Sequence, residues 1–333
     1  MSASIPTAFC ATEPEPRKVD KVLVVLPAYK AAQTLKATID EIPKDFACDI
    51  LLVDDASPDD TIDVSRALGI HTVRHYTNRG YGANQKTCYQ VALETGADII
   101  IMLHPDYQYD PRVLPAMAEI IRLNICDVIL GNRIRSRRDA LRCGMPRYKY
   151  IANRFLTILE NFVLGQNLGD FHSGLRAYAR NVLETVPFHA NSDDFVFDSQ
   201  FLAQAAYFGF RIGDLPVPCR YFREASSINF KRSLRYGLAT VWTLVVFVLA
   251  SLGISRSALF RPGKRPSAAP APPPAAPARA RRRRFLEECL SWPLRSHPSR
   301  VRSDRIRDAN PHRRRRASAR PGGSWFFSRT PFS

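Results

Sequence analysis

A buried strand that ends in a cluster of polar residues is the feature that most constrains the fold of this chain. The run Ile99–Leu103 is continuously apolar, and Asp106, Gln108 and Asp110 follow it. Such a run is typical of a parallel strand covered on both faces, and open α/β sheets bind ligands outside the carboxyl ends of their strands. The pattern recurs at residues 22–29 and 49–58. We therefore expect three strand ends to meet at one site, which favours a nucleotide-handling enzyme.

Short apolar runs alternate with amphipathic stretches from residue 19 to about residue 129. This alternation predicts an α/β fold with a mostly parallel, Rossmann-like nucleotide-binding sheet flanked by helices. Residues 131–235 are richer in Arg, Tyr, Phe and Asn and less periodic, which is typical of function-specific loops. The expected strands are 22–26, 49–53, 71–74, 98–103 and 126–130, and the expected helices lie near 32–42, 59–68, 83–95 and 111–123.

The positive charge of the chain is concentrated in its C-terminal part. Residues 255–333 hold 20 of the 48 Lys and Arg residues but only 4 of the 31 Asp and Glu residues, so residues 1–254 are almost neutral. We predict a flexible N-terminus (1–18), a catalytic domain (19–235), an apolar helix (236–255) and a disordered Arg/Pro/Ala-rich tail (256–333). The 20 uncharged residues between Arg235 and Arg256 are just long enough to span a bilayer, and a buried or interfacial helix fits them equally well.

The cysteines and the N-terminus bear on the compartment. The seven cysteines are scattered without paired spacing, which favours free thiols in a reducing compartment over a disulfide framework or a zinc site. The first 18 residues lack the order of a secretory signal. We expect a cytoplasmic protein at the cytoplasmic face of a membrane.

Acidic residues at the second and fourth strand ends are the leading candidates for donor binding. Asp54 and Asp55 are placed to accept hydrogen bonds from a base or ribose, and the alternative is that Asp55 or Ser57 merely caps the following helix. Asp106 and Gln108 supply the oxygen ligands that Mg²⁺ or Mn²⁺ prefers, and the alternative is a turn acid bound only to solvent. His104 is a secondary candidate ligand.

Other polar loops suit an anion or a base, and each has a plainer structural interpretation. Gly80 and Gly82 precede a helix, so that backbone amides there would approach a phosphate or ribose closely. Asp193 and Asp194 either cap a helix or supply a general base. A second group of loops would bind a diphosphate or an anionic acceptor, unless they are merely solvated; these loops carry Arg133, Arg176, Arg223, Ser226 and Ser227.

Taken in order, these motifs resemble a family 2 glycosyltransferase with the type A fold (GT-A), closest to the polyprenyl-phosphate, dolichol-phosphate mannose synthase-like branch. The resemblance covers residues 19 to about 235. The motifs that carry it are Leu26-Pro-Ala-Tyr29, Leu52-Val-Asp-Asp-Ala-Ser57, Asn78-Arg-Gly-Tyr-Gly82, His104-Pro-Asp-Tyr-Gln108, Gly131-Asn-Arg133, Ser173-Gly-Leu-Arg176 and Ala225-Ser-Ser-Ile-Asn229.

The resemblance implies a nucleotide-sugar donor and roles for particular residues. The family's metal motif usually begins with Asp, where this chain has His104, which would alter the metal preference. The implied reaction is a single displacement with inversion. By resemblance, Pro27, Tyr29, Asp54 and Asp55 hold the nucleotide, Asp106 and Gln108 hold Mg²⁺ or Mn²⁺, and Arg133, Arg176 and Arg223 surround the diphosphate or the acceptor phosphate.

The acceptor and the role of the tail remain open at this stage. A lipid-phosphate acceptor needs little deprotonation, whereas a glycan hydroxyl needs a base, for which Asp193 or Asp194 would be the candidate. The basic tail suits an anionic membrane surface. An alternative from another class is a nucleic-acid-binding protein that acts through the tail, but the Arg blocks there have few aromatic neighbours and no recognised binding fold, so nucleic acid is a disfavoured partner.

Overall fold

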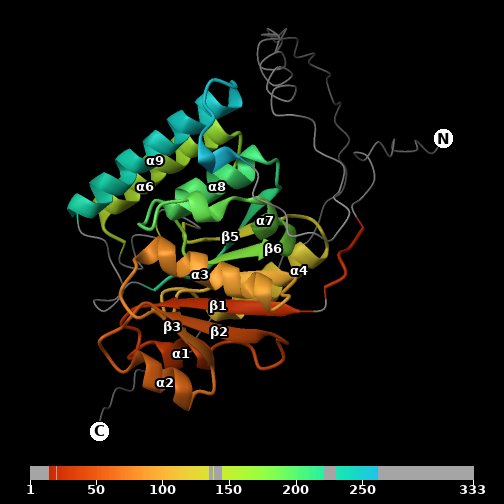
Figure 1. Cartoon of the computed structure of the whole chain (residues 1–333), viewed down its shortest axis with the longest axis vertical. Coiled ribbons are helices and arrows are strands. Elements are labelled where there is room, and N and C mark those ends of the chain that lie inside the picture. The colour runs from red at the N-terminus through yellow and green to blue at the C-terminus, as the bar shows by residue number, and fades with distance from the viewer. Residues whose placement is uncertain (1–14, 20, 135–137, 139–144, 221–229, 262–333) are drawn as a thin grey trace, which may run out of the picture. The chain divides into compact units, whose positions relative to one another are not determined.

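Seven strands form a single sheet in the computed structural model, which describes residues 15–19, 21–134, 138, 145–220 and 230–261. All of these residues belong to the first of two units of the chain, Met1–Glu287. The sheet order is β3-β2-β1-β4-β6-β5-β7 (Figure 1). The strands are β1 (Val22–Ala28), β2 (Asp49–Asp54), β3 (His71–Arg74), β4 (Ile99–Met102), β5 (Val128–Asn132), β6 (Arg176–Ala179) and β7 (Ile212–Pro216).

The sheet is parallel except at one strand. β1, β2, β3 and β4 pair in parallel, as do β5 and β7, whereas β6 runs antiparallel between β4 and β5. The predicted α/β fold with a mostly parallel sheet is therefore confirmed. β6 escaped prediction because its sequence, Arg176-Ala-Tyr-Ala179, has no apolar run, and the predicted loop region 131–235 in fact supplies two strands and several helices.

The central strands are apolar because both of their faces are covered. Every residue of β1 and β4 is buried, and Val24 and Leu26 have no exposed surface. α3 packs on β1 and β2, and α4 packs on β4, β5 and β6. The N-terminal helices confirm the predicted order with slightly different ends: α1 (Leu35–Asp40), α2 (Thr61–Ala67), α3 (Tyr81–Glu94), the short 3₁₀ helix η1 (Pro111–Val113) and α4 (Leu114–Arg122).

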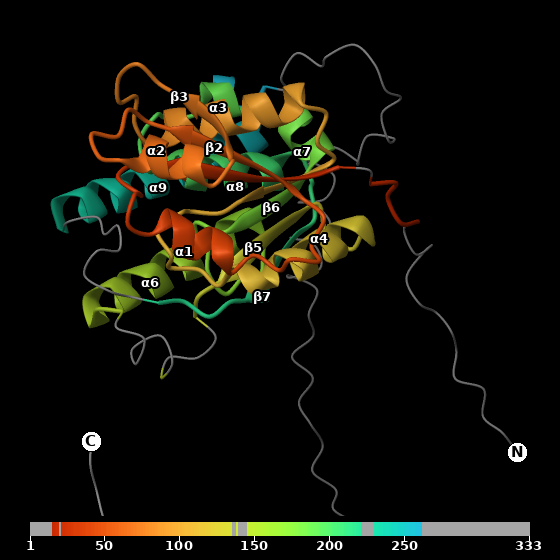
Figure 2. The same cartoon turned by 90° about the horizontal axis from the view of Figure 1, so that it is seen from below.

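A group of helices follows β5 and builds the other end of the domain. Figure 1 shows α6, α8 and α9 at the end opposite α1 and α2, and Figure 2 shows α6 and α9 projecting to the same side. α9 packs against both α6 and α8. The bounds are α6 (Arg147–Leu164), α7 (Arg180–Thr185), η2 (Phe188–Ala190), α8 (Phe197–Tyr207), α9 (Phe230–Ser251) and η3 (Ala258–Phe260).

α9 is the predicted apolar helix, and it begins at Phe230 rather than at residue 236. In the described part of the chain, this one helix is long and apolar enough to cross a membrane by length and composition. Thr243, Leu244 and Phe247 on one side of it are nevertheless buried against the domain. The helix therefore packs along one side on the domain.

The two predicted flexible ends are shorter than expected where the structure describes them. The Arg17 amide donates to the Arg122 carbonyl at 2.7 Å, so residues just before β1 are anchored. After α9, Phe260 is 6% exposed and its ring packs on Tyr207 and Phe247. Phe260 thus packs on the domain beyond the predicted tail start at residue 256, and the rest of the predicted tail, residues 262–333, lies outside the described part.

Candidate active site

Backbone strain marks the edge of the sheet where the predicted strand ends meet. Among the described residues, four that are not glycine have a positive φ, and three of them, Lys30 (57°), Ala56 (55°) and Tyr107 (59°), follow β1, β2 and β4. Left-handed backbone is costly for such residues and is concentrated at functional sites. Because β6 is antiparallel, its first residue, Arg176, begins at this same edge.

Asp54 ends β2 with one carboxylate oxygen left without a donor. Its Oδ2 accepts the Ser57 amide at 3.0 Å and lies 3.8 Å from the Arg74 Nε. Its Oδ1 is buried and makes no hydrogen bond within the described structure. A buried acceptor without a partner costs about 1–3 kcal/mol. The atom is therefore suited to receive a donor from a bound molecule.

Asp55 is instead occupied by the protein itself. Its carboxylate accepts hydrogen bonds from the His75 ring Nδ1 at 2.7 Å and from the Arg79 and Gly80 amides at 2.8 and 2.9 Å. These contacts hold the loop between β3 and α3. Asp55 thus positions this loop, and the nucleotide contact that the resemblance implies stays a prediction.

Gly80 and Gly82 pack against protein backbone. A Cβ on Gly80, whose φ is +97°, would lie 2.8 Å from the Asp193 carbonyl oxygen, and one on Gly82 would lie 2.3 Å from the Ser192 carbonyl oxygen. The Gly82 amide donates to the Asp193 carbonyl at 2.8 Å. The glycines therefore permit a close approach of two chain segments, and the Gly82 amide is not directed at a phosphate.

The two candidate bases, Asp193 and Asp194, are both exposed. Asp193 Oδ1 lies 2.7 Å from the Lys86 Nζ, and Asp194 Oδ1 accepts the Phe195 amide at 2.8 Å. Both carboxylates thus have local partners, and neither caps α8, whose N-cap residue is Val196.

Pro27 and Tyr29 differ in their access to a ligand. Pro27 lies within β1 opposite Val53 and is buried. Tyr29 follows the strand and is 50% exposed, with the Lys30 Nζ 5.5 Å from its ring centroid. Of the two, only Tyr29 presents its side chain to solvent at this edge.

Asp106 and Gln108 follow β4, as predicted. Asp106 Oδ1 accepts the Gln108 amide at 3.2 Å, and Gln108 is 7% exposed. Burial raises the pKa of Asp106, and the nearby His104 works in the opposite direction. A carboxylate with few protein partners at the rim of a sheet is a favourable ligand for a hard cation.

His104 is held in one orientation by Tyr81 and Gly174. The Tyr81 hydroxyl donates to Asp198 Oδ2 at 2.7 Å and lies 3.1 Å from the His104 Nε2. Because a phenol has one hydrogen, the His104 Nε2–H must donate to Tyr81, which leaves Nδ1 as the acceptor nitrogen. A Cβ on Gly174 would lie 2.3 Å from the His104 Cδ2, so only glycine admits the ring. Burial lowers the pKa of His104.

Arg176 lies inside the protein. It is fully buried, and its Nε and Nη2 donate to the Ser173 and Phe171 carbonyls at 2.8 and 3.1 Å. Its Nη1 lies 3.2 Å from Asp198 Oδ1. Since its donors are directed at protein acceptors, Arg176 positions the 171–176 loop and Asp198. The contact of Arg176 with a diphosphate or acceptor phosphate stays a prediction.

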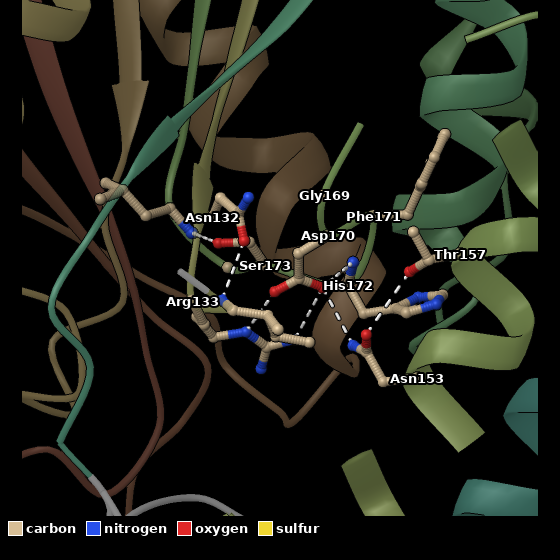
Figure 3. A network of polar contacts seen from close by, with 12 residues as sticks. Asn132, Arg133, Asn153, Thr157, Gly169, Asp170, Phe171, His172 and Ser173 are labelled. Carbon is tan, nitrogen blue, oxygen red and sulfur yellow. Dashed lines mark hydrogen bonds and ion pairs between the residues drawn. The ribbon is translucent and has the colours of Figure 1, made fainter. Parts of the chain in front are cut away.

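Arg133, in contrast, forms a two-pronged ion pair at the end of β5 (Figure 3). Its Nε and Nη2 donate to the two Asp170 oxygens at 2.7 and 3.1 Å, and Asp170 also accepts from Asn153 of α6 and from the His172 amide, both at 3.0 Å. Burial of Asp170 opposes its ionisation, but the Arg133 charge and hydrogen bonds hold its pKa well below the usual range. The pair fixes the Arg133 guanidinium beside the strand ends.

The same loop is tied to two helices behind it. The His172 Nδ1 lies 2.7 Å from the Tyr236 hydroxyl of α9, and its Nε2 lies 3.2 Å from Glu160 Oε2 of α6. Burial raises the pKa of Glu160 well above its usual range and lowers that of His172 to about 4. The loop 169–173 is thereby linked to both helices through buried polar groups.

Three predicted residues, Arg223, Ser226 and Ser227, lie outside the described residues. Within the part that is described, no group of three or more His, Cys, Asp or Glu is arranged to hold a metal ion. Mg²⁺ is commonly held by one or two carboxylates together with substrate phosphates. The single carboxylate of Asp106 fits that mode of binding and does not fit a site built from protein ligands alone.

The sequence interpretation missed Tyr81, Asp170 and Asp198. Tyr81 lies in the Asn78–Gly82 motif and Asp170 precedes the Ser173–Arg176 motif, so their positions beside matched motifs were the available signal. Asp198 gave only the pattern of an acid at a helix start. What each contacts depends on residues far away in the chain.

The fold is that of an α/β protein whose candidate site lies at the carboxyl edge of its sheet. Residues 23–186 match the model of the family described as Glycosyl transferase family 2, and the chain belongs to this family of glycosyltransferases. The recognition made from the motifs is thereby confirmed.

Two curated relatives are similar over most of their length. The undecaprenyl-phosphate mannosyltransferase of Micrococcus luteus is 27% identical over 207 residues, which cover 59% of this chain and 82% of that protein. The UDP-N-acetylglucosamine–dolichyl-phosphate N-acetylglucosaminyltransferase of Methanococcus voltae is 24% identical over 220 residues, which cover 61% and 87%.

A solved structure supports the GT-A fold. Glucosyl-3-phosphoglycerate synthase from Mycobacterium tuberculosis, in complex with Mn²⁺, uridine-diphosphate-glucose and phosphoglyceric acid, superposes with a TM-score of 0.51 at 18% identity. The match covers 76% of this chain and 89% of that one. At this identity the likeness shows a shared fold.

Proposed function

We propose that this enzyme transfers a sugar from a nucleoside-diphosphate donor to a polyprenyl phosphate or a similar membrane-associated acceptor, with inversion at the anomeric carbon. The observation that carries the proposal is a pair of acids at one edge of the sheet. Asp54 lies at the carboxyl end of β2, and Asp106 lies just beyond the carboxyl end of β4. Asp54 Oδ1 supports it as a buried acceptor awaiting a donor. The curated relatives that use lipid-phosphate acceptors support the acceptor class.

The spacing of the two acids suits a nucleoside diphosphate. β1 lies between β2 and β4 in the sheet. Neighbouring strands are about 4.8 Å apart, so the ends of β2 and β4 are separated by roughly 10 Å. A base or ribose N–H or O–H at Asp54 would leave the diphosphate near Asp106.

Asp106 would hold a divalent cation, with Gln108 and His104 Nδ1 as the neighbouring candidates. A cation bound there would offset the charge that develops on the departing diphosphate. The family's structural neighbours with Mn²⁺ or Mg²⁺ and UDP support the use of such an ion. Tyr81 and Asp198 would keep the His104 ring in one tautomer and one orientation.

Arg133 would receive the acceptor phosphate. Its two-pronged pair with Asp170 fixes the guanidinium, and a rigid guanidinium is a strong phosphate partner. An oxygen of the lipid phosphate would form the bond to the anomeric carbon while the bond to the diphosphate oxygen breaks, and the nucleoside diphosphate would leave. A phosphate is already ionised near neutral pH, so this route needs no general base.

We further propose that residues 19–235 with α9 form the catalytic unit, and that it works at the cytoplasmic face of a membrane. The apolar surface of α9 and the membrane-lipid acceptors named for the relatives support this location.

The test is transfer of labelled sugar from a panel of GDP- and UDP-sugars to a short-chain polyprenyl phosphate in detergent, with the unphosphorylated polyprenol as the control. We expect product with the phosphate alone, and equal activity in an Asp193→Asn, Asp194→Asn double variant. Transfer to the polyprenol or to a saccharide hydroxyl, abolished in the double variant, would instead support the base-dependent reaction.

A further inference from the structure

α6 carries a stripe of large apolar side chains that face solvent. The exposed fractions are 50% for Tyr148, 66% for Ile151, 65% for Phe155, 61% for Ile158 and 84% for Phe162. Their spacing of three and four residues places them on one face of the helix. An exposed apolar face of this length is unusual for a protein surface without a partner.

α9 carries a second exposed apolar stripe beside the first. Leu234 is 57%, Leu238 is 64% and Trp242 is 66% exposed, and Val241 and Val245 are also exposed. The two helices are in contact, because a Cβ on Gly237 of α9 would lie 3.8 Å from the Leu156 Cδ1 of α6. They lie side by side in Figure 1 and project to the same side in Figure 2. We call these two stripes together the α6/α9 apolar face.

The charges around this face have one sign. Arg147 at the start of α6, and Arg232 and Arg235 in the first turns of α9, are exposed. The one acid of α6, Glu160, is buried, and α9 contains no acidic residue. Basic residues beside exposed Phe, Tyr and Trp fit an anionic lipid surface. A second copy of this face would bring like charges together.

The two helices that carry the face also hold the site. Asn153 of α6 donates to Asp170, and Tyr236 of α9 contacts His172. Burial and the nearby Arg133 charge lower the pKa of Lys149 in the first turn of α6, so two cations lie close together where the helix meets the site. Asn153 and Arg133 share the Asp170 carboxylate, so Arg133 lies beside α6.

We propose that the α6/α9 apolar face inserts into one leaflet of an anionic membrane and brings the lipid phosphate to Arg133. The delivery of the acceptor rests on the proposed function, whereas insertion does not depend on it. The partner of the α6/α9 apolar face is therefore the lipid surface, and α9 lies along the leaflet.

The test is flotation of the full chain with vesicles of phosphatidylcholine containing phosphatidylglycerol, at 0.1 M and 0.5 M NaCl. High salt weakens purely electrostatic binding by the basic tail. We expect the wild-type chain to stay bound at 0.5 M NaCl, and a Phe155→Glu, Ile158→Glu, Trp242→Glu variant to partition at least about 10-fold less under these conditions. A Leu123→Glu, Ile125→Glu variant, changed at exposed apolar residues outside the face, should bind like the wild type.

A second measurement reports insertion directly. In a Trp292→Phe, Trp325→Phe background, Trp242 is the remaining tryptophan. We expect its fluorescence to shift to the blue on vesicles and to be quenched by brominated acyl chains. The proposal would be overturned by unchanged Trp242 fluorescence or by salt-resistant binding that survives the triple substitution. It would also be overturned if the chain were a dimer that the triple substitution converts to a monomer. Nucleotide binding measured on the same samples separates this outcome from failure of the proposed function, because the donor site does not include the face.

Discussion

The two halves of the candidate site are built from different kinds of structure. The donor half consists of acids at the ends of buried parallel strands: Asp54 is the last residue of β2, and Asp106 lies in the loop that follows β4. The other half depends on Arg133, which is fixed by Asp170 from a distant loop, and this loop is in turn held by α6 and α9. Local sequence order therefore determines the first half, whereas long-range buried polar contacts determine the second.

This difference predicts different responses to mutation. In the donor half, Asp106 accepts a hydrogen bond from the neighbouring Gln108 amide and has no buried ion pair within the described residues, so its loss should affect chemistry more than folding. In the other half, Asp170 is completely buried and the Arg133 side chain is only 13% exposed. Removal of one member of such a pair leaves an uncompensated buried charge, so stability and activity should fall together.

The largest effect is expected from Asp106→Ala in the donor half. Loss of the cation's carboxylate ligand would remove about 4 kcal/mol of stabilisation from the departing diphosphate, which corresponds to a roughly 1000-fold lower kcat. The measurement is steady-state transfer, and Asp63→Ala, at an exposed acid of α2, is the control. A loss of less than 10-fold would place the cation elsewhere.

Asp170→Asn should destabilise the chain by about 3 kcal/mol, because Arg133 would keep its charge without a buried counter-ion. The change is measured as the free energy of unfolding in urea. In the control, Asp40→Asn, the lost partner is Lys36, both side chains are exposed (52% and 66%), and the expected cost is below about 1 kcal/mol. Equal costs for the two variants would remove the distinction between the buried and exposed pairs.

The stability gap between the wild type and Asp170→Asn should also depend on pH. Because the folded-state pKa of Asp170 is lowered, the unfolded chain binds the proton first as pH falls. The contribution of Asp170 is therefore fully present above the unfolded pKa of about 4 and is lost as pH falls from there towards the folded value. Unfolding free energies of both proteins from pH 7 to pH 3 provide the measurement, and a gap that widens in acid would contradict the assignment.

The smallest effect is expected for Tyr81→Phe, which removes the hydroxyl between His104 and Asp198. Loss of one orienting hydrogen bond should weaken Mn²⁺-dependent activity by about 10-fold, equivalent to about 1.4 kcal/mol. The Mn²⁺ concentration dependence of transfer is the readout, with Tyr76→Phe, at a fully exposed ring, as the control. If Tyr81→Phe matched this control, His104 would have no role at the cation.

The positions of the donor-half residues in the fold follow from the sequence because that information is local. Polar residues at the end of an apolar run are expected at the carboxyl edge of the sheet. The positions of Asp54, Asp106 and Gln108 therefore follow from the order of residues along the chain. The role of Asp55 was not accessible in this way, because its three donors come from residues 20 to 25 positions later in the chain. A carboxylate that binds a ligand and one that binds a loop look the same in the sequence.

The helical half was harder to predict for physical reasons. From the sequence, Arg176 is a candidate phosphate ligand in a polar loop. In the structure its side chain is buried and donates to the Ser173 and Phe171 carbonyls, which only the folded loop brings together. The exposed stripe of α6 was detectable, since Tyr148, Ile151, Phe155, Ile158 and Phe162 follow helical spacing. Periodicity alone does not say whether such a stripe faces the core or the outside.

The most direct test of the central claim is calorimetric binding of GDP- and UDP-sugars to the full chain, with Mn²⁺, Mg²⁺ or neither, in the wild type, Asp54→Asn and Asp106→Ala. For the wild type, we predict that one nucleotide class binds and that the cation strengthens its binding. In Asp54→Asn, binding should be weaker both with and without the cation. In Asp106→Ala, the cation should no longer affect binding. Binding that is unaffected by both substitutions would contradict the assignment of the donor to this edge of the sheet.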